Sequence, residues 1–130
     1  MGKKVVRFED LEIWIAAMAI AKDIYLKTSS IKDYYIRDQI NRAALSISNN
    51  IAEGFEYNND AEFLRFLKYA KGSCGEVRSI LFFLKETGLM NVEDCKMFTV
   101  QAESISKQIM GLMKYIRANR KENKGNVTVL

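Results

Sequence analysis

The sequence predicts an all-α protein, an antiparallel up-down-up-down four-helix bundle formed by a single domain. Three observations predict this fold class. Apolar residues recur at steps of three and four in four long segments, the connections between the segments are short and polar, and the 130 residues include no proline. The predicted organisation is an N-terminal arm (1–9), a bundle (10–118) with helices at about 10–27, 33–55, 60–87 and 92–118, and a flexible basic tail (119–130).

The first two helices are predicted from their apolar stripes and from their ends. The first should begin at Asp10, which can act as its N-cap. The second should begin at Asp33 and end where Gly54 and a short polar stretch interrupt the pattern. The residues assigned to the core are Leu11, Trp14, Met18, Ala21 and Tyr25 in the first helix and Ile36, Ile40, Ala43, Ile47 and Ile51 in the second.

The third and fourth helices carry clearer start and stop signals. Asn59 followed by Glu62 resembles a capping box, and Gly88 stands where a left-handed residue would end the third helix. Asn91 should open the fourth helix, whose first turn is acidic. The core stripes are Phe63, Leu67, Ala70, Cys74, Val77, Leu81 and Leu84, then Cys95, Phe98, Ala102, Ile105, Ile109, Leu112 and Ile116.

The composition is typical of a globular protein of the cytosol. Hydrophobic residues make up 48% and charged residues 28%, and no apolar run is long enough to span a bilayer. Cys74 and Cys95 are expected to be free, buried thiols. The sequence contains no histidine, so a zinc site would need cysteine and carboxylate ligands alone. We therefore expect no metal, no cofactor and no catalytic residue.

A polar stripe interrupts the apolar pattern where the second and third helices should meet. Antiparallel pairing around the turn near Asn58 places Arg42 level with Glu76 and Glu53 level with Arg65, so a structural network of ion pairs and hydrogen bonds is expected. The network consists of Arg42, Ser46, Asn50, Glu53, Arg65, Ser73 and Glu76. Alternatives are a ligand pocket lined by Arg42, Asn50 and Glu53, or a di-metal carboxylate site, which the lack of histidine disfavours.

The first and third helices carry more apolar residues than one core can bury. Every residue from Ile13 to Ala21 is apolar, and the run 80–84 repeats this excess. Because soluble proteins avoid large exposed apolar patches, we expect a homo-oligomer held by the outer sides of these two helices. The residues predicted to lie at this interface are Ile13, Ala16, Ala17, Ile20, Phe82 and Phe83.

Basic residues flank the predicted bundle at both ends of the chain. In an up-down bundle these two segments are neighbours, so their positive charges could form a nucleic-acid contact, although acidic residues dilute them. The net charge of +4 is mild. The possible contact residues are Lys3, Lys4, Arg7, Lys114, Arg117, Arg120 and Lys121.

Three blocks of residues, in order and in register, resemble a known family. They are Phe8-x-Asp10-Leu11-x-x-Trp14; then Arg42-Ala43-Ala44, Ser46-Ile47 and Asn50-Ile51-Ala52-Glu53-Gly54; then Phe63, Phe66-Leu67, Ala70, Gly72-Ser73 and Glu76. Over about 8–117 the chain resembles the bacterial four-helix bundle proteins named after intervening sequences in 23S ribosomal RNA genes. The resemblance implies a bundle that assembles as a ring, a pentamer, with no established molecular function. Relatives include accessory proteins of diversity-generating retroelements, which work with a reverse transcriptase and bind nucleic acid.

The chain departs from the family pattern at places where its relatives are often basic. Relatives often carry two basic residues where Asn41-Arg42 stands, proline where Ser48 stands, and basic residues where this chain has Phe55-Glu56-Tyr57. This loss of positive charge weakens the nucleic-acid interpretation. The function we expect is therefore a non-enzymatic, homo-oligomeric scaffold or adaptor in the cytosol, with a nucleic-acid-binding accessory protein as the alternative.

Overall fold

The computed structural model describes residues 4–119, and residues 1–3 and 120–130 lie outside that range. The flexible tail predicted over 119–130 falls almost entirely outside the described residues. Within them the chain forms four α-helices and no strand, which confirms the predicted fold class. The elements are the 3-10 turn η1 (Phe8–Asp10), α1 (Glu12–Thr28), α2 (Tyr34–Glu56), α3 (Asp60–Glu86) and α4 (Val92–Asn119).

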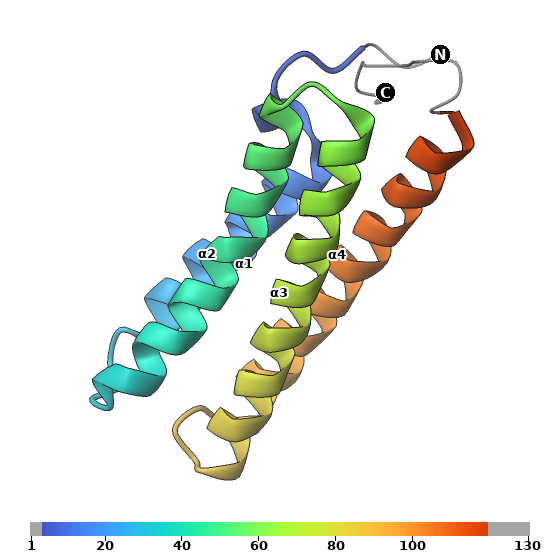
Figure 1. Cartoon of the computed structure of the whole chain (residues 1–130). Helices are drawn as coiled ribbons and strands as arrows, with labels where there is room; N and C mark the ends of the chain where they lie inside the picture. The colour runs from blue at the N-terminus through green and yellow to red at the C-terminus, as the bar shows by residue number, and fades with distance from the viewer. Residues whose placement is uncertain (1–3, 120–130) are drawn as a thin grey trace.

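The four helices pack side by side around one core. The α1–α2 and α3–α4 connections lie at one end of the bundle, and the α2–α3 connection lies at the other (Figure 1). Each helix contacts its neighbours in the chain, and α1 also contacts α4, so the helices enclose the core from all sides. The N-terminal segment and the last turns of α4 lie at the same end as the α2–α3 connection (Figure 1).

Local capping signals place most helix ends where the sequence predicts them. Asn59 caps α3, because its Oδ1 accepts a hydrogen bond from the Glu62 N–H at 3.0 Å. Asn91 caps α4 in the same way, accepting from the Asp94 N–H at 2.7 Å. Gly88 has a φ of 73°, the left-handed conformation expected of a glycine that follows a helix.

The predicted start of α1 is wrong. Asp10 belongs to the preceding 3-10 turn, and α1 begins at Glu12 after Leu11, whose backbone is extended and whose side chain cannot cap the helix. Leu11 is buried instead, with 6% of its surface exposed. The start of α1 is therefore set by packing of an apolar side chain rather than by a capping hydrogen bond.

The face of α1 that enters the core also differs from the prediction. Ile13, Ala17 and Ile20 were expected to point outward, yet they are 6%, 0% and 2% exposed and belong to the core. Ala16 is half-buried and packs against that core, whereas Tyr25, assigned to the core, is 65% exposed. A segment that is apolar on every side has no polar face, so its periodicity cannot select the buried side.

Gly54 does not end α2, which continues to Glu56. It lies inside the helix where α2 approaches α3 closely, because a Cβ built on Gly54 would stand 2.6 Å from the Phe66 Cβ. The left-handed residue of the α2–α3 connection is Asn58, with a φ of 52°. Glycine at this position therefore serves helix packing and not helix termination.

The two cysteines are free and buried, as predicted. Burial raises the pKa of the Cys74 thiol to about 11. Burial also raises the pKa of the Cys95 thiol, and the Asp94 carboxylate adds to the effect. A thiol with a raised pKa remains protonated at neutral pH and is a poor nucleophile, so both residues act as parts of the core.

Candidate functional site

Polar side chains join α2 to α3 in the middle of the bundle. The Ser46 and Ser73 hydroxyl groups share a hydrogen bond of 2.8 Å across the two helices. Asn50 Nδ2 donates to Ser46 Oγ at 2.9 Å and to the Ser46 carbonyl at 2.8 Å. These contacts connect three of the seven residues of the predicted network, and they confirm the predicted register to within about two residues.

The charged half of the predicted network does not form. Within the described residues no ion pair joins Arg42 to Glu76 or Glu53 to Arg65. Arg42, Glu53 and Glu76 are exposed, because they lie on the outer sides of their helices, where water solvates them.

Arg65 has a nearer partner on its own helix. Its guanidinium donates to Glu62 Oε1 at 2.6 Å and to the Tyr69 hydroxyl at 3.2 Å, and the bond to Glu62 is the largest cause of the raised Arg65 pKa. Side chains one turn apart on a helix meet without further ordering of the backbone, so this local pair replaces the predicted contact with Glu53.

The ligand-pocket and di-metal alternatives gain no support from the geometry. The exposed side chains of Arg42 and Glu53 do not converge with Asn50, whose amide is bonded to Ser46. Among residues 4–119, no group of three or more histidine, cysteine, aspartate or glutamate side chains is placed to hold a metal ion.

A row of exposed apolar residues runs along the outer side of α1. Ile15 and Leu26 are 52% and 61% exposed, and Ala19 is exposed between them. We call these three residues the α1 ridge. Their spacing of four and seven residues places them on one side of the helix, opposite the buried isoleucines. Ile13, Ala17 and Ile20, predicted to lie at an interface, are buried within the subunit, so this ridge replaces them as a candidate interface.

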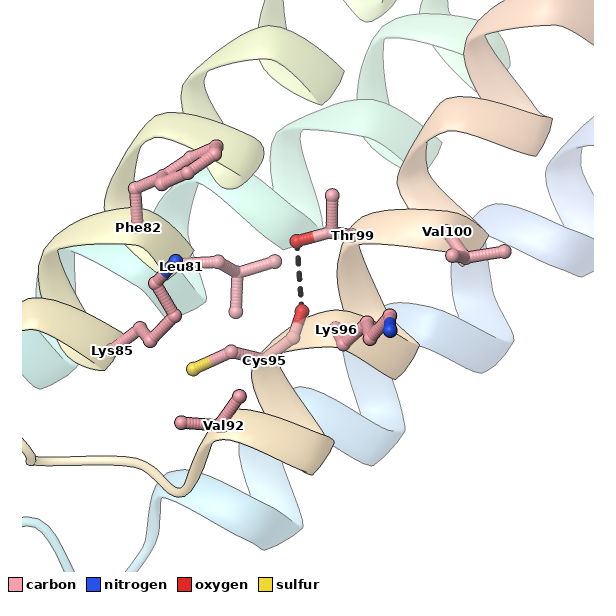
Figure 2. Close-up of a pocket in the computed structure, with 8 residues that line it drawn as sticks. All are labelled: Leu81, Phe82, Lys85, Val92, Cys95, Lys96, Thr99 and Val100. Atoms are coloured by element: carbon pink, nitrogen blue, oxygen red, sulfur yellow. Dashed lines mark hydrogen bonds between the residues drawn. The ribbon is translucent and has the colours of Figure 1, made fainter.

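A second apolar surface lies between α3 and α4, near the end where these helices are connected. It is a cavity of about 350 Å³, here called the α3–α4 groove, with buried Leu81 and Cys95 at its base. Figure 2 shows the residues that line it. The Thr99 hydroxyl donates to the Cys95 carbonyl at 2.7 Å. The other residues that line the groove are Phe82, Lys85, Val92, Lys96 and Val100.

The walls of this groove are unusually apolar for a helix surface. Phe82, Val92 and Val100 are 56%, 60% and 58% exposed, and Lys85 Nζ lies 4.9 Å from the Phe82 ring centroid. Phe83, the other phenylalanine predicted to point outward, is 51% exposed. The outward orientation of both phenylalanines matches the prediction. The predicted interface did not include Val92 and Val100. Both are apolar residues that stand outside the core stripe of α4, and this position could have indicated them.

The described basic residues of the possible nucleic-acid contact gather at one end of the bundle. Lys4, Arg7, Lys114 and Arg117 are exposed at the end that holds the N-terminal segment and the last turns of α4. Arg7 pairs with Glu9 at 3.1 Å, which neutralises part of the charge. Lys3, Arg120 and Lys121 lie outside the described residues. The N-terminal segment and α4 also line a cavity of about 380 Å³, whose residues include Val5, Asp10, Glu12, Leu112 and Tyr115.

The family resemblance is confirmed by comparison with known proteins. Residues 9–111 match the family described as 23S rRNA-intervening sequence protein. The chain belongs to this family. The match begins in η1 and extends into the second half of α4, so the polar contact between α2 and α3, the α1 ridge and the α3–α4 groove all lie within the region shared with the 23S rRNA-intervening sequence proteins.

A solved structure supports the same fold. A protein of unknown function from the S23 ribosomal protein family of Bacteroides thetaiotaomicron VPI-5482 superposes with a TM-score of 0.73 at 23% sequence identity. The alignment covers 78% of this chain and 98% of that protein. A search of curated protein sequences finds no match. Among the described residues, no helix is both long and apolar enough to cross a lipid bilayer.

Proposed function

We propose that this 23S rRNA-intervening sequence protein is a non-enzymatic scaffold or adaptor that assembles with copies of itself into a ring, a pentamer as the family resemblance implies. The observation that carries the proposal is the pair of exposed apolar surfaces on different sides of the bundle, the α1 ridge and the α3–α4 groove. The proposed setting is the bacterial cytosol, where free thiols stay reduced.

Self-association is favourable in free energy because it would bury apolar side chains that a monomer leaves exposed to water. The α1 ridge and the groove leave five large side chains more than half exposed: Ile15, Leu26, Phe82, Val92 and Val100. Complete burial of an exposed side chain of this size contributes about 1.5–3 kcal/mol, so each of these half-buried side chains would add roughly half of that. Several of them repeated at every contact can outweigh the roughly 4–15 kcal/mol that association costs in lost freedom.

The placement of the two surfaces favours a head-to-tail contact. Within residues 4–119, α1 contacts α2 and α4 but not α3, so α1 and α3 stand at diagonal positions of the bundle. When two different surfaces meet, every pair of subunits still has one free surface of each kind. Further subunits can therefore bind until the row of subunits closes into a ring.

The surface chemistry supports a role without catalysis. Glu53 and Glu76, the two carboxylates of the predicted polar network, stand exposed on α2 and α3. General acid–base catalysis needs a carboxylate in a cleft beside a group that perturbs it. The two thiols are buried and have raised pKa values, which also makes nucleophilic chemistry unfavourable.

Light scattering coupled to size-exclusion chromatography tests the proposal directly. At micromolar concentration the full chain should elute with a mass five times the 14.9 kDa of one chain. A monomeric mass would contradict self-association and the scaffold role together. A closed oligomer of another size would retain the scaffold and correct the number of subunits.

A second candidate is a nucleic-acid-binding accessory protein, favoured by the gathering of Lys4, Arg7, Lys114 and Arg117 at one end. In a ring these charges would be repeated, and affinity for phosphates grows with the number of contacts. We expect weak binding at physiological salt. Tight, salt-resistant binding to one structured RNA, measured by filter binding with and without Lys114→Glu, would place this candidate above the scaffold.

A further inference from the structure

The α3–α4 groove has the shape and charge of a binding site, here called the seat, for an amphipathic helix. Its base is apolar, its walls carry exposed Phe82, Val92 and Val100, and Lys96 brings positive charge from α4, whereas Lys85 of α3 pairs with Glu86 at 3.9 Å. Lys96 forms no ion pair within the described part of the chain. The groove therefore suits an apolar side chain that stands beside a carboxylate.

Two glycines continue this surface along α3. Gly72 and Gly75 lie in the middle of the helix, where glycine is less favourable than alanine. A Cβ built at either position would meet no atom of the described chain within 4 Å, and neither has a positive φ. Nothing in the subunit itself requires glycine there, whereas close approach of a second helix does.

The α1 ridge matches this surface in spacing. Leu26 and Ala19 are seven residues apart, as are Phe82 and Gly75; Leu26 and Ile15 are eleven apart, and Phe82 and Gly72 are ten. At 1.5 Å per residue the matching points lie about 10 Å and about 16 Å along both helices. Along the two helices, Phe82 therefore lies level with Leu26, Gly75 with Ala19, and Gly72 with Ile15.

The ends of the two surfaces are also level. Lys27 of α1 pairs with Asp94 of α4 at 3.3 Å, which places the Leu26 end of the ridge at the height of the groove. α1 and α3 run in the same direction along the bundle (Figure 1). In a ring whose axis follows the helices, every subunit keeps these heights, so the ridge of one subunit faces the groove and glycines of the next without a shift.

Two pairs of charges beside the two surfaces are complementary, whereas Lys22, exposed within the ridge between Ala19 and Leu26, adds positive charge to the ridge itself. Glu12 and Asp23 stand exposed beside the ridge, at its two ends, and neither forms an ion pair within residues 4–119. Lys68 lies four residues before Gly72, and Lys96 lies in the groove. With the ridge seated, Glu12 stands near Lys68 and Asp23 near Lys96, so each carboxylate gains an ammonium partner.

We infer that the α1 ridge of one subunit seats in the α3–α4 groove and over Gly72 and Gly75 of the next copy of this chain. The inference rests on the proposed self-association and names its two surfaces. Because the groove opens between α3 and α4 and not directly opposite α1, successive subunits turn relative to one another. That turn lets the series close into a ring, whereas opposed surfaces would extend as a filament.

A single substitution at Gly75 tests the seat. Gly75→Leu adds a side chain where the subunit itself is open, so helical content by circular dichroism should remain while light scattering shows loss of the assembly. The matched control is Asn49→Leu, an exposed position in the middle of α2, a helix that the proposed contact does not use; its mass should stay that of the unmutated chain. An assembly that survives Gly75→Leu would overturn the inference.

Cross-linking gives an independent test of which surfaces meet. Lys22→Cys, next to the ridge, and Ser79→Cys, between Gly75 and Phe82, are co-expressed as two chains of different length and treated with a short bismaleimide. The chain without added cysteines is the control, because Cys74 and Cys95 are buried. Covalent pairs should join one variant to the other and not two copies of Lys22→Cys.

The outcomes separate this inference from the proposed function. Pairs between two copies of Lys22→Cys, or no pairs in a sample that scatters light as an oligomer, would overturn the seat and leave self-association intact. A sample that scatters light as a monomer would remove both. Pairs between the two different variants support the seat and the head-to-tail contact at once.

Discussion

Gly54 shows how one residue sets the distance between two helices. Its missing side chain lets α2 approach the Phe66 side chain of α3, and the same approach brings Ser46 and Ser73 into hydrogen-bond distance. The shared hydrogen bond then gives each hydroxyl group a partner at this contact. A glycine and two serines in one interface thus replace the bulky side chains that would hold the helices further apart.

Gly54→Ala should destabilise the protein although alanine favours helices. The added Cβ would lie 2.6 Å from the Phe66 Cβ, and relieving such an overlap costs about 1–3 kcal/mol, more than the roughly 1 kcal/mol gained in helix propensity. Gly111→Ala, in open surroundings, should stabilise instead. Urea unfolding of both variants measures the difference. Equal gains at the two positions would mean that α2 and α3 are not closely packed at Gly54.

The thiol of Cys74 should make stability depend on pH in the alkaline range. Burial raises its pKa from 9.0 to about 11, so the folded chain holds the proton that the unfolded chain releases. Its stabilising contribution is complete below pH 9 and decreases as the pH rises towards 11. The free energy of unfolding of the unmutated chain, minus that of Cys74→Ala, should fall by about 2 kcal/mol between pH 8 and pH 10.5.

The subtraction isolates the thiol, since every other residue is the same in both chains. If the two chains lose stability in parallel over this range, the Cys74 thiol is accessible to solvent in the folded state. Urea midpoints at four or five pH values are sufficient to distinguish the two results.

At the scale of the helices, the sequence predicts where a helix begins and ends better than it predicts which side of the helix is buried. Asn59, Asn91 and Gly88 act through hydrogen bonds and backbone conformation within a few residues, so their roles can be read locally. The buried side of α1 depends on how Ile13 and its apolar neighbours pack against the other helices. That choice is made by tertiary packing, and a run that is apolar on every side contains no pattern to reveal it.

The predictions for the contact between α2 and α3 were likewise partly right and partly wrong. Ser46 and Ser73 were predicted to belong to the network between these helices, and they meet because antiparallel pairing fixes which turns lie side by side. The predicted pairing of Arg42 with Glu76 failed because equal height along two helices does not mean equal direction around them. Long charged side chains also gain little from pairing at a hydrated surface.

Substitutions on the two sides of α1 should have opposite effects. Ile20→Asp places a carboxylate at a site that is 2% exposed, so it should cost more than about 3 kcal/mol and reduce helical content. Leu26→Asp changes a side chain that is 61% exposed, so helical content should remain while the assembly dissociates. Circular dichroism and light scattering on both variants separate these effects. If Ile20→Asp instead dissociated the assembly and left the helices intact, Ile20 would lie on the outer side of α1, as the sequence predicted.

At the scale of the whole molecule, assembly and folding should be linked. Subunits that bind only in the folded state stabilise it by mass action, so the thermal midpoint should rise with protein concentration. Between about 1 and 100 μM chain the unmutated protein should show this rise, and Leu26→Asp should show a constant midpoint. A midpoint independent of concentration in both chains would contradict self-association in this range.

The end of the bundle that holds the N-terminal segment also holds the last turns of α4 (Figure 1). A domain fused before Lys4 and another fused after Asn119 would therefore emerge on the same side of the molecule, close enough to touch each other. The opposite end offers only the two short connections 29–33 and 87–91. In the proposed scaffold, cargo attached through either terminus would therefore gather at one end of the bundle and leave the other end clear.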